Sequence, residues 1–244
     1  MLDKKYVLAP FQELLDKCRN TVLFGLRILE KIDVFPEPTQ EELVLLQFST
    51  GHVGDVVDSK AVFKKWLLLT GFQDIHLCLR SALERLYVFK TSEKNVLIDG
   101  TELEKKLEKV SQLKLSDLLQ KINSVADRPI EYKEHIDSIN MVRNCLAHSH
   151  GIVADRFCND KEEGKLIISG SRFKFFYRGS GGETVADFGK QGPENTSLNL
   201  SAEDFKMEFL KGQEITFSLR EFFDILSTCI FIRADIGVLL ERNN

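Results

Sequence analysis

Proline and long apolar runs are scarce in this chain of 244 residues, which contains only 5 prolines. Long helices would therefore meet few residues that break them. The most apolar stretch, residues 225–240, is interrupted by Arg233 and Asp235. No apolar run approaches the roughly 18 residues that a membrane-spanning helix needs. The N-terminal segment MLDKKYVLAPFQELLDK lacks the apolar core of a secretory signal peptide, so we expect a cytoplasmic protein that does not enter a membrane.

Paired cysteines and a dominant charge are also missing. The 5 cysteines are far apart and form no Cys-x-x-Cys pair, which argues against a zinc ribbon or a thioredoxin-type site. We expect free thiols in a reduced compartment, with no metal and no cofactor. With 33 basic and 37 acidic residues, the net charge of −4 gives no overall signature of nucleic-acid binding, and a local basic pocket is left open. The cysteines are Cys18, Cys78, Cys145, Cys158 and Cys229.

Apolar residues recur every three or four positions over most of the chain, a spacing typical of amphipathic helices. Ser218 and Glu221 form a capping-box pattern before the last apolar segment, which is expected to be a central core helix. Gly71, inside a long helical pattern, predicts a kink or a close contact between helices. The predicted helices are Phe11 to about Glu30, Thr39 to Phe48, Ser59 to about Lys90, Thr101 to about Ile122, Glu131 to about His148, and Ser218 to about Glu241.

The apolar period changes to two in the region that precedes the last helix. Residues 165–169 and 172–178 are predicted as strands joined by a tight turn at Gly170 and Ser171. Further alternation predicts a second hairpin, with a short helix over residues 203–210 as the alternative. The apolar residues of this second hairpin are Phe205, Met207, Phe209, Ile215 and Phe217.

These elements predict one mainly α-helical domain over residues 1–244. A helical bundle is expected at about 8–150 and 218–241, with a small β-hairpin or meander insertion at about 163–217, before the last helix. The insertion is too short to bury a core of its own, so it is not counted as a separate domain.

Polar residues suited to phosphate chemistry gather at the end of the helix that precedes the insertion, in the order Asn140, Arg143, Asn144, His148, His150. An arginine can hold a phosphate through its planar set of donors. A histidine titrates near neutral pH and can move a proton, and an asparagine can orient either group. Gly151 follows where a C-terminal glycine would end the helix.

Helix geometry limits what one copy of this segment can do. Arg143 and His148 lie about 140° apart around a continuous helix, whereas Asn144 and His148 share a face. Either the helix ends near Ala147 and frees His148, or the functional groups converge from two subunits across a two-fold axis.

The six residues from Arg143 to His148 resemble the signature of the HEPN domain family, in which Arg-Asn is followed by three residues and a histidine. Gly151, Ile152 and Val153 are similar to the continuation in the larger members. The helical regions extend the resemblance loosely, and the strand-rich segment 163–217 has no counterpart in the minimal fold.

The resemblance implies a helical bundle that dimerises through the 131–150 helix and acts as a metal-independent endoribonuclease in toxin–antitoxin, phage-defence or RNA-processing systems. It implies that Arg143 and His148 are catalytic and that Asn144 accompanies them, with RNA as substrate and an antitoxin or a nucleotidyltransferase as possible partner. Toxins silenced by nucleotidyl transfer carry a tyrosine at the position of His150, so that regulation is not implied here. Because other members have lost activity, a non-catalytic nucleotide-, RNA- or protein-binding module is the alternative.

Other polar residues have simpler interpretations. His76 is expected to be a hydrogen-bonded core histidine rather than a ligand. Arg80 and Glu84, four residues apart, are expected to pair, with a place facing the HEPN cleft as the alternative. Basic residues alternate with aromatic ones on a predicted strand, which indicates a polar outer face or, alternatively, a grip on RNA. These basic residues are Arg172, Lys174 and Arg178.

Overall fold

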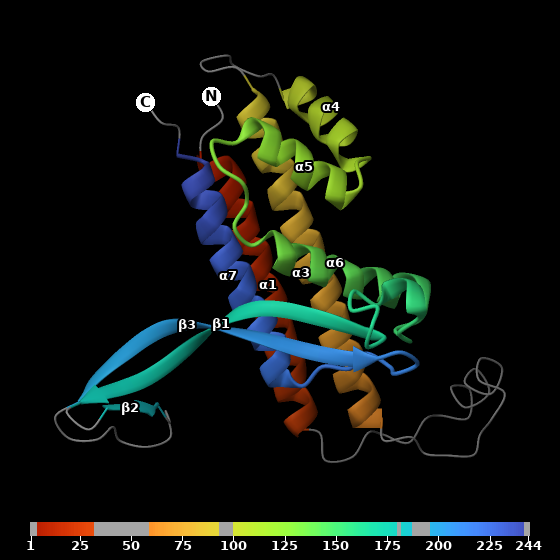
Figure 1. Ribbon diagram of the computed structural model, residues 1–244, viewed down its shortest axis with the longest axis vertical. Helices are drawn as coiled ribbons and strands as arrows, with labels where there is room; N and C mark the ends of the chain where they lie inside the picture. The colour runs from red at the N-terminus through yellow and green to blue at the C-terminus, as the bar shows by residue number, and fades with distance from the viewer. Residues whose placement is uncertain (1–3, 32–58, 93–99, 180–181, 187–195, 242–244) are drawn as a thin grey trace.

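The computed structural model describes residues 4–31, 59–92, 100–179, 182–186 and 196–241 (Figure 1). It confirms a mainly helical protein with a small antiparallel sheet before the last helix. The expected helix over residues 39–48 lies outside the described residues. In chain order the elements are α1 (Lys4–Lys31), α3 (Ser59–Thr91), α4 (Gly100–Ser111), α5 (Leu115–Val125), α6 (Lys133–His148), the 3₁₀ helix η1 (Asp155–Phe157), β1 (Lys165–Gly179), β2 (Gly182–Val185), β3 (Ser197–Leu210) and α7 (Leu219–Leu239).

Three long helices, α1, α3 and α7, lie side by side and form the core (Figure 1). Gly71 of α3 lies in close contact with both other helices, because a Cβ there would lie 2.7 Å from Val22 of α1 and 2.8 Å from Phe222 of α7. The expected close contact at Gly71 is therefore confirmed. The buried residues of α7 cover about half of its circumference, so the helix is part of the core, as expected. They are Phe222, Ile225, Leu226, Thr228, Cys229, Ile232, Asp235, Ile236 and Leu239.

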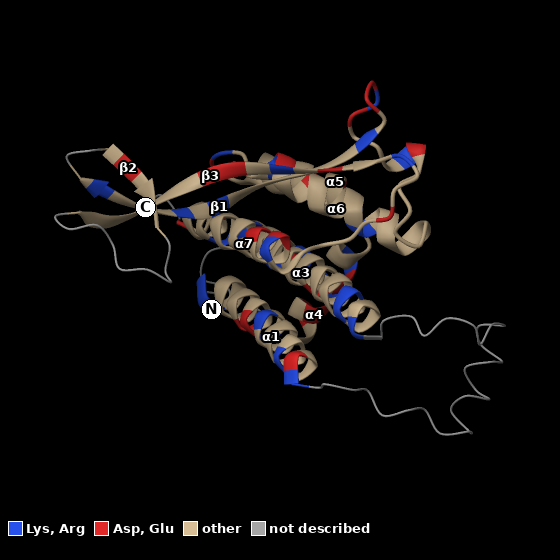
Figure 2. Cartoon of the chain, turned by 90° about the horizontal axis from the view of Figure 1, so that it is seen from below, with Lys and Arg blue, Asp and Glu red and all other residues tan. Residues whose placement is uncertain are grey.

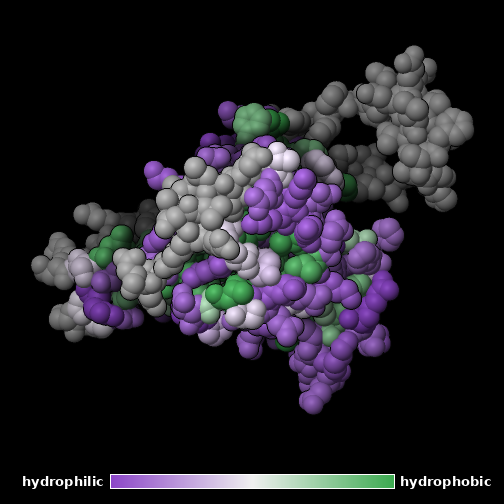
Figure 3. Space-filling view, turned by 90° about the horizontal axis from the view of Figure 1, so that it is seen from above, coloured by the Kyte–Doolittle hydropathy of each residue, from purple (hydrophilic) through white to green (hydrophobic). Residues whose placement is uncertain are grey.

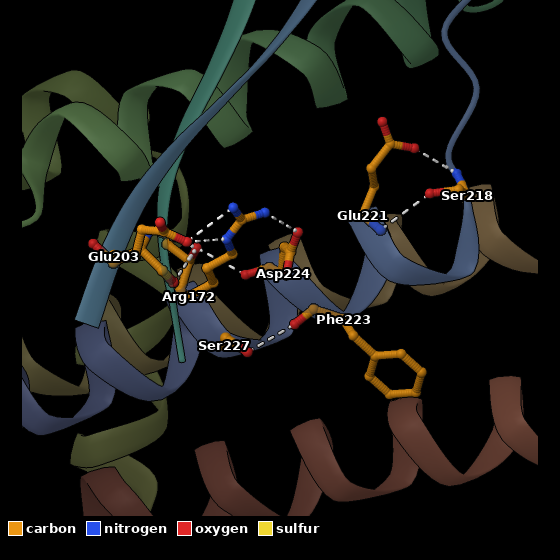
Figure 4. Close-up of polar contacts among 9 residues, drawn as sticks. Arg172, Glu203, Ser218, Glu221, Phe223, Asp224 and Ser227 are labelled. Atoms are coloured by element: carbon orange, nitrogen blue, oxygen red, sulfur yellow. Dashed lines mark hydrogen bonds and ion pairs between the residues drawn. The ribbon is translucent and has the colours of Figure 1, made fainter. Parts of the chain in front are cut away.

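The start of α7 is fixed by its capping box (Figure 4). Ser218 Oγ accepts a hydrogen bond from Glu221 N at 3.2 Å, and Glu221 Oε2 accepts one from Ser218 N at 2.7 Å. Figure 4 also shows Arg172 of β1 between two acids: it pairs with Glu203 of β3 at 2.9 Å and with Asp224 of α7 at 3.3 Å. These contacts hold the sheet against the first turns of α7.

The helix expected from Thr101 to about Ile122 is two helices, α4 and α5. Arg80 of α3 supplies the physical reason, because its Nη2 donates to the carbonyl oxygens of Ser111 and Leu113, each at 2.7 Å. The guanidinium thus satisfies carbonyls at the end of α4 and lets the chain turn. Arg80 also pairs with Glu84 at 2.8 Å, which confirms the expected ion pair.

The predicted turn at Gly170 and Ser171 is wrong, because β1 runs unbroken through both residues. Gly170 pairs with Phe205 of β3 in the antiparallel ladder. A Cβ on Gly170 would lie 2.3 Å from Thr228 Oγ1 and 2.5 Å from the Phe205 ring. The glycine is needed for close packing against α7, and not for a change of chain direction.

The predicted second hairpin is also wrong. Residues 203–210 form part of β3 and not a helix, and β3 pairs with β1 along its whole length in a sheet of order β2-β1-β3. Ile215 and Phe217 follow the strand as an extended link: Ile215 N donates to Gly151 O at 2.8 Å, and the Phe217 ring stacks on Phe72. The alternation of apolar residues predicts the strand β3, but it does not show that β3 pairs with β1.

The edge of β1 that faces the helices is covered by side chains. Three polar side chains each form hydrogen bonds with both the N–H and the carbonyl oxygen of one β1 residue. Asn159 binds Ile167 in this way. Ser138 of α6 binds Ser169, and Thr228 of α7 binds Ser171. The sheet is therefore clamped between α6 and α7. The far halves of β1 and β3 extend beyond the helices, together with β2 (Figure 1).

Charges of both signs are mixed over the helices and the sheet when the molecule is seen from below (Figure 2). The opposite face, seen from above, is mostly hydrophilic with separate hydrophobic patches (Figure 3). The mixture of charges in Figure 2 agrees with the nearly balanced composition.

Candidate functional site

α6 carries the candidate residues, and its position is fixed by burial on one side and by the link before it. Its buried residues are Ile136, Ser138, Ile139, Val142 and Cys145. The preceding link is tied to α7 by Asp235, which is 4% exposed, accepts a hydrogen bond from Glu131 N at 3.0 Å and pairs with Arg128. The apolar spacing of α6 leaves a more open side, which runs from the half-buried Asn140 beside α3 through Asn144 to the exposed His148.

Arg143 is half-buried on α6, and its Nη1 donates to Asn144 Oδ1 at 3.3 Å. Asn140, one turn earlier, reaches α3, where its Oδ1 lies 3.2 Å from His76 Nε2. His76 is 3% exposed, which confirms a hydrogen-bonded core histidine. Asn140 thus ties α6 to α3, and Arg143 and Asn144 follow it on the next turn of α6.

The environment of His76 favours the neutral ring. Burial lowers the pKa of His76 to about 4, the hydrogen bond to Asn140 opposes this, and the positive charges of Arg143 and Arg80 add to the lowering. A carbonyl oxygen can only accept, so Nε2 carries the proton of the neutral ring in this arrangement. The Nδ1 atom of His76 is buried without a hydrogen-bond partner in the structure.

His148 is the last residue of α6, and its side chain is exposed. Ser149 caps the helix, since its Oγ donates to Cys145 O at 2.8 Å and to Ile152 O at 2.7 Å. The chain then passes through two residues of positive φ, His150 at 52° and Gly151 at 79°. The glycine therefore contributes to the turn that follows the helix, and the exposed His150 lies in the same turn.

α6 ends at His148, close to the end near Ala147 that the sequence suggested, and His148 still belongs to its last turn. Arg143 and His148 consequently lie about 140° apart around the axis and about 7.5 Å apart along it. Arg143 lies at the edge of the helix that faces α3, whereas His148 faces solvent. One copy of the chain brings Arg143, Asn144 and Asn140 together but does not bring Arg143 to His148.

Arg156 is a neighbour of the motif that the sequence reasoning missed. Its Nη2 donates to His148 O at 3.0 Å, and its guanidinium lies 4.7 Å over the ring of Phe157. No sequence motif links residues 148 and 156, because the contact depends on the turn between α6 and η1. The arginine adds a second cation beside the end of α6.

A second polar cluster joins the first turn of α6 to the sheet. His135 Nδ1 lies 3.1 Å from Ser169 Oγ and its Nε2 3.3 Å from Ser171 Oγ, and Ser171 Oγ donates to Asp204 Oδ1 at 2.8 Å. Burial lowers the pKa of His135, and the charges of Asp204 and Glu134 oppose this. No sequence pattern points to this cluster, because His135 is 34 residues from Ser169 and Ser171 is 33 residues from Asp204. Its hydrogen bonds link α6, β1 and β3.

The basic residues of β1 are largely paired with acids. Arg172 binds Glu203 and Asp224, and Arg178 binds Glu183 at 2.6 Å. Two of the three cations considered for an RNA grip are therefore neutralised within the chain, which favours the interpretation as a polar outer face.

Across the described ranges, no group of three or more His, Cys, Asp or Glu side chains is placed to hold a metal ion. None of the helices in these ranges combines the length and the apolar character needed to cross a membrane. Comparison with known proteins found no matching family model, no matching curated protein and no matching solved structure.

Proposed function

We propose that the chain is a metal-independent endoribonuclease of the HEPN type, with Arg143 and His148 as its catalytic residues. One observation carries the proposal: the six-residue motif lies on a packed helix that presents a held arginine and an exposed histidine. Asn144 supports the arginine through its hydrogen bond, and Asn140 links the same helix to α3.

The chemistry follows from the two side chains. The ribose 2′-oxygen attacks the adjacent phosphorus while the bond from phosphorus to the 5′-oxygen breaks, which leaves a 2′,3′-cyclic phosphate and a free 5′-hydroxyl. His148 takes the proton of the 2′-hydroxyl or delivers a proton to the leaving 5′-oxygen, and water makes the other of these two proton transfers. Arg143 stabilises the negative charge that builds up on the phosphate. The reaction needs no metal, because the nucleophile belongs to the substrate.

The active unit in this proposal is a homodimer that packs through the 131–150 helix. The separation of Arg143 from His148 within one copy supports a composite site, because a two-fold contact can bring His148 of one protomer to the partner's Arg143. The open side of α6 offers a surface for such a contact, with Met141 half-buried and Ala147 exposed beside the motif. His150, in the turn after α6, would lie close to the same cleft.

We further propose that such a nuclease acts in the cytoplasm as a toxin or a phage-defence component. An antitoxin would be the partner that restrains it. These roles rest on the HEPN resemblance alone, and a gene encoding such a partner next to this one would support them.

Cleavage of RNA in the presence of EDTA tests the proposal. Purified protein is incubated with mixed RNA, and the products are examined for 2′,3′-cyclic phosphate ends. Arg143→Lys keeps the charge but loses the planar donor set, and His148→Gln keeps polarity but cannot transfer a proton. We expect turnover to fall by about 10²–10⁴-fold in His148→Gln, with little loss of RNA affinity.

Arg27→Lys on the exposed face of α1 is the matched control and should cut like the wild type. Cleavage that persists undiminished in both motif variants removes the nuclease assignment from this site. RNA binding without cleavage by the wild-type protein would instead favour the non-catalytic binding module.

A further inference from the structure

Arg156 is held rigidly beside the motif by the chain around it. Its Nη2 donates to His148 O at 3.0 Å, and its guanidinium lies 4.7 Å over the ring of Phe157, a residue that is 7% exposed. The turn between α6 and η1 is itself anchored, because Val153 N donates to Gln213 O at 2.9 Å and Gly212 N to Val153 O at 2.8 Å. Two contacts therefore place the guanidinium beside the end of α6, and such placement reduces the entropy lost on binding.

Most of the donors of Arg156 remain available. A guanidinium has five N–H groups, and the carbonyl of His148 uses one of them. No carboxylate of the described residues forms an ion pair with Arg156, and the neighbouring Asp155 is paired instead with Lys211 at 3.1 Å. The positive charge of Arg156 is thus exposed and uncompensated by any acid in the described part of the chain, unlike those of Arg172 and Arg178.

We infer that Arg156 binds a backbone phosphate of single-stranded RNA, next to the phosphate that is cut. The inference rests on the proposed function, and it adds a substrate-binding residue outside the six-residue motif. A planar donor set that points to solvent matches the oxygens of a phosphodiester. The hydrogen bond to the main chain of His148 places the guanidinium beside the residue whose side chain is proposed to transfer the proton.

Arg156 would then position the substrate and take no part in the chemical step. Its loss should raise KM and leave kcat nearly unchanged, because the contact is equally strong in the ground state and in the transition state. A substrate with a single phosphodiester has no neighbouring phosphate and should be insensitive to the change. The salt dependence of binding reports the contact directly, because each neutralised phosphate releases counterions.

The experiment measures the affinity of a 2′-O-methyl RNA oligonucleotide, which cannot be cleaved, by fluorescence anisotropy between 50 and 200 mM NaCl, a range of roughly fourfold in salt. For Arg156→Gln we expect about tenfold weaker binding and a slope of log K against log [salt] that is smaller by about 0.7. Arg156→Lys should keep the wild-type slope, because it keeps the charge. Arg27→Gln, an exposed arginine on α1, should change neither quantity.

The outcomes separate this inference from the proposed nuclease. Wild-type affinity and slope in Arg156→Gln, in a protein that cuts RNA, would refute the role of Arg156 and leave the nuclease intact. An Arg156-dependent slope in a protein that does not cut RNA would support the phosphate site and refute the nuclease. A wild-type protein that neither binds nor cuts RNA would refute both. A change in slope for Arg156→Lys equal to that for Arg156→Gln would indicate a structural role.

Discussion

The buried His76 makes the stability of the fold depend on pH in a way that can be calculated. Its pKa is lowered to about 4 in the folded protein, from 6.5 in the unfolded chain. As the pH falls below about 6.5 the unfolded chain takes up a proton that the folded protein refuses, so the free energy of unfolding falls. The stabilisation is therefore complete above the unfolded pKa and is lost progressively as the pH falls toward 4.

The two pKa values set the size of the effect. Between pH 7 and pH 5 the linkage relation gives a loss of roughly 2 kcal/mol in the free energy of unfolding from this residue alone. His135 adds a loss of the same sign, because burial also lowers its pKa. Comparison with His76→Gln isolates the contribution of His76, since glutamine is neutral throughout and can still donate a hydrogen bond to Asn140.

The assay is urea unfolding of both proteins at pH 7 and pH 5, followed by circular dichroism. The wild-type protein should lose roughly 2 kcal/mol more than His76→Gln over this interval, whatever the variant costs at pH 7. An equal loss in the two proteins would show that His76 titrates normally in the folded state. That result would contradict its burial between α3 and α6, and with it the account of how Asn140 is held.

Two further predictions concern the fold. Gly170→Ala should destabilise the protein by about 1–3 kcal/mol in urea unfolding, because the new Cβ meets Thr228 and Phe205. Gly100→Ala is the control, since a Cβ at Gly100 has no atom within 4 Å. Equal stabilities of the two variants would contradict the close packing of β1 on α7. Ser218→Ala should lower the free energy of unfolding by about 1 kcal/mol, because the capping box is lost. The same measurement on Ser116→Ala, in α5, is the control. Equal stabilities of the two variants would mean that the cap does not stabilise the fold.

Sequence patterns predicted those helices whose bounds depend on residues close together along the chain. The apolar repeat placed the long helix within a residue of α3, and the pattern at Ser218 and Glu221 marked the start of α7. The errors have distant causes. The break between α4 and α5 depends on Arg80, some thirty residues earlier, and the strand through Gly170 depends on Thr228 of α7. The sequence alone does not distinguish a glycine that allows a turn from a glycine that allows close packing against a helix.

The candidate site divides in the same way. The motif on α6 could be named from the sequence, because its residues are close together along the chain. The hydrogen bond between His76 and Asn140 spans 64 residues, and the contact of Arg156 depends on a turn after the helix. Neither leaves a periodic or spaced pattern, so both required the fold.

Complementation between two inactive variants tests the composite site most directly. Arg143→Ala and His148→Ala are purified separately, shown to be inactive on RNA in EDTA, and then mixed in equal amounts and allowed to exchange subunits. In a mixed dimer one site combines an intact Arg143 from one protomer with an intact His148 from the other. Random exchange should therefore restore about a quarter of the wild-type activity. A mixture as inactive as its components, beside a wild-type protein that cuts RNA, would contradict the composite site.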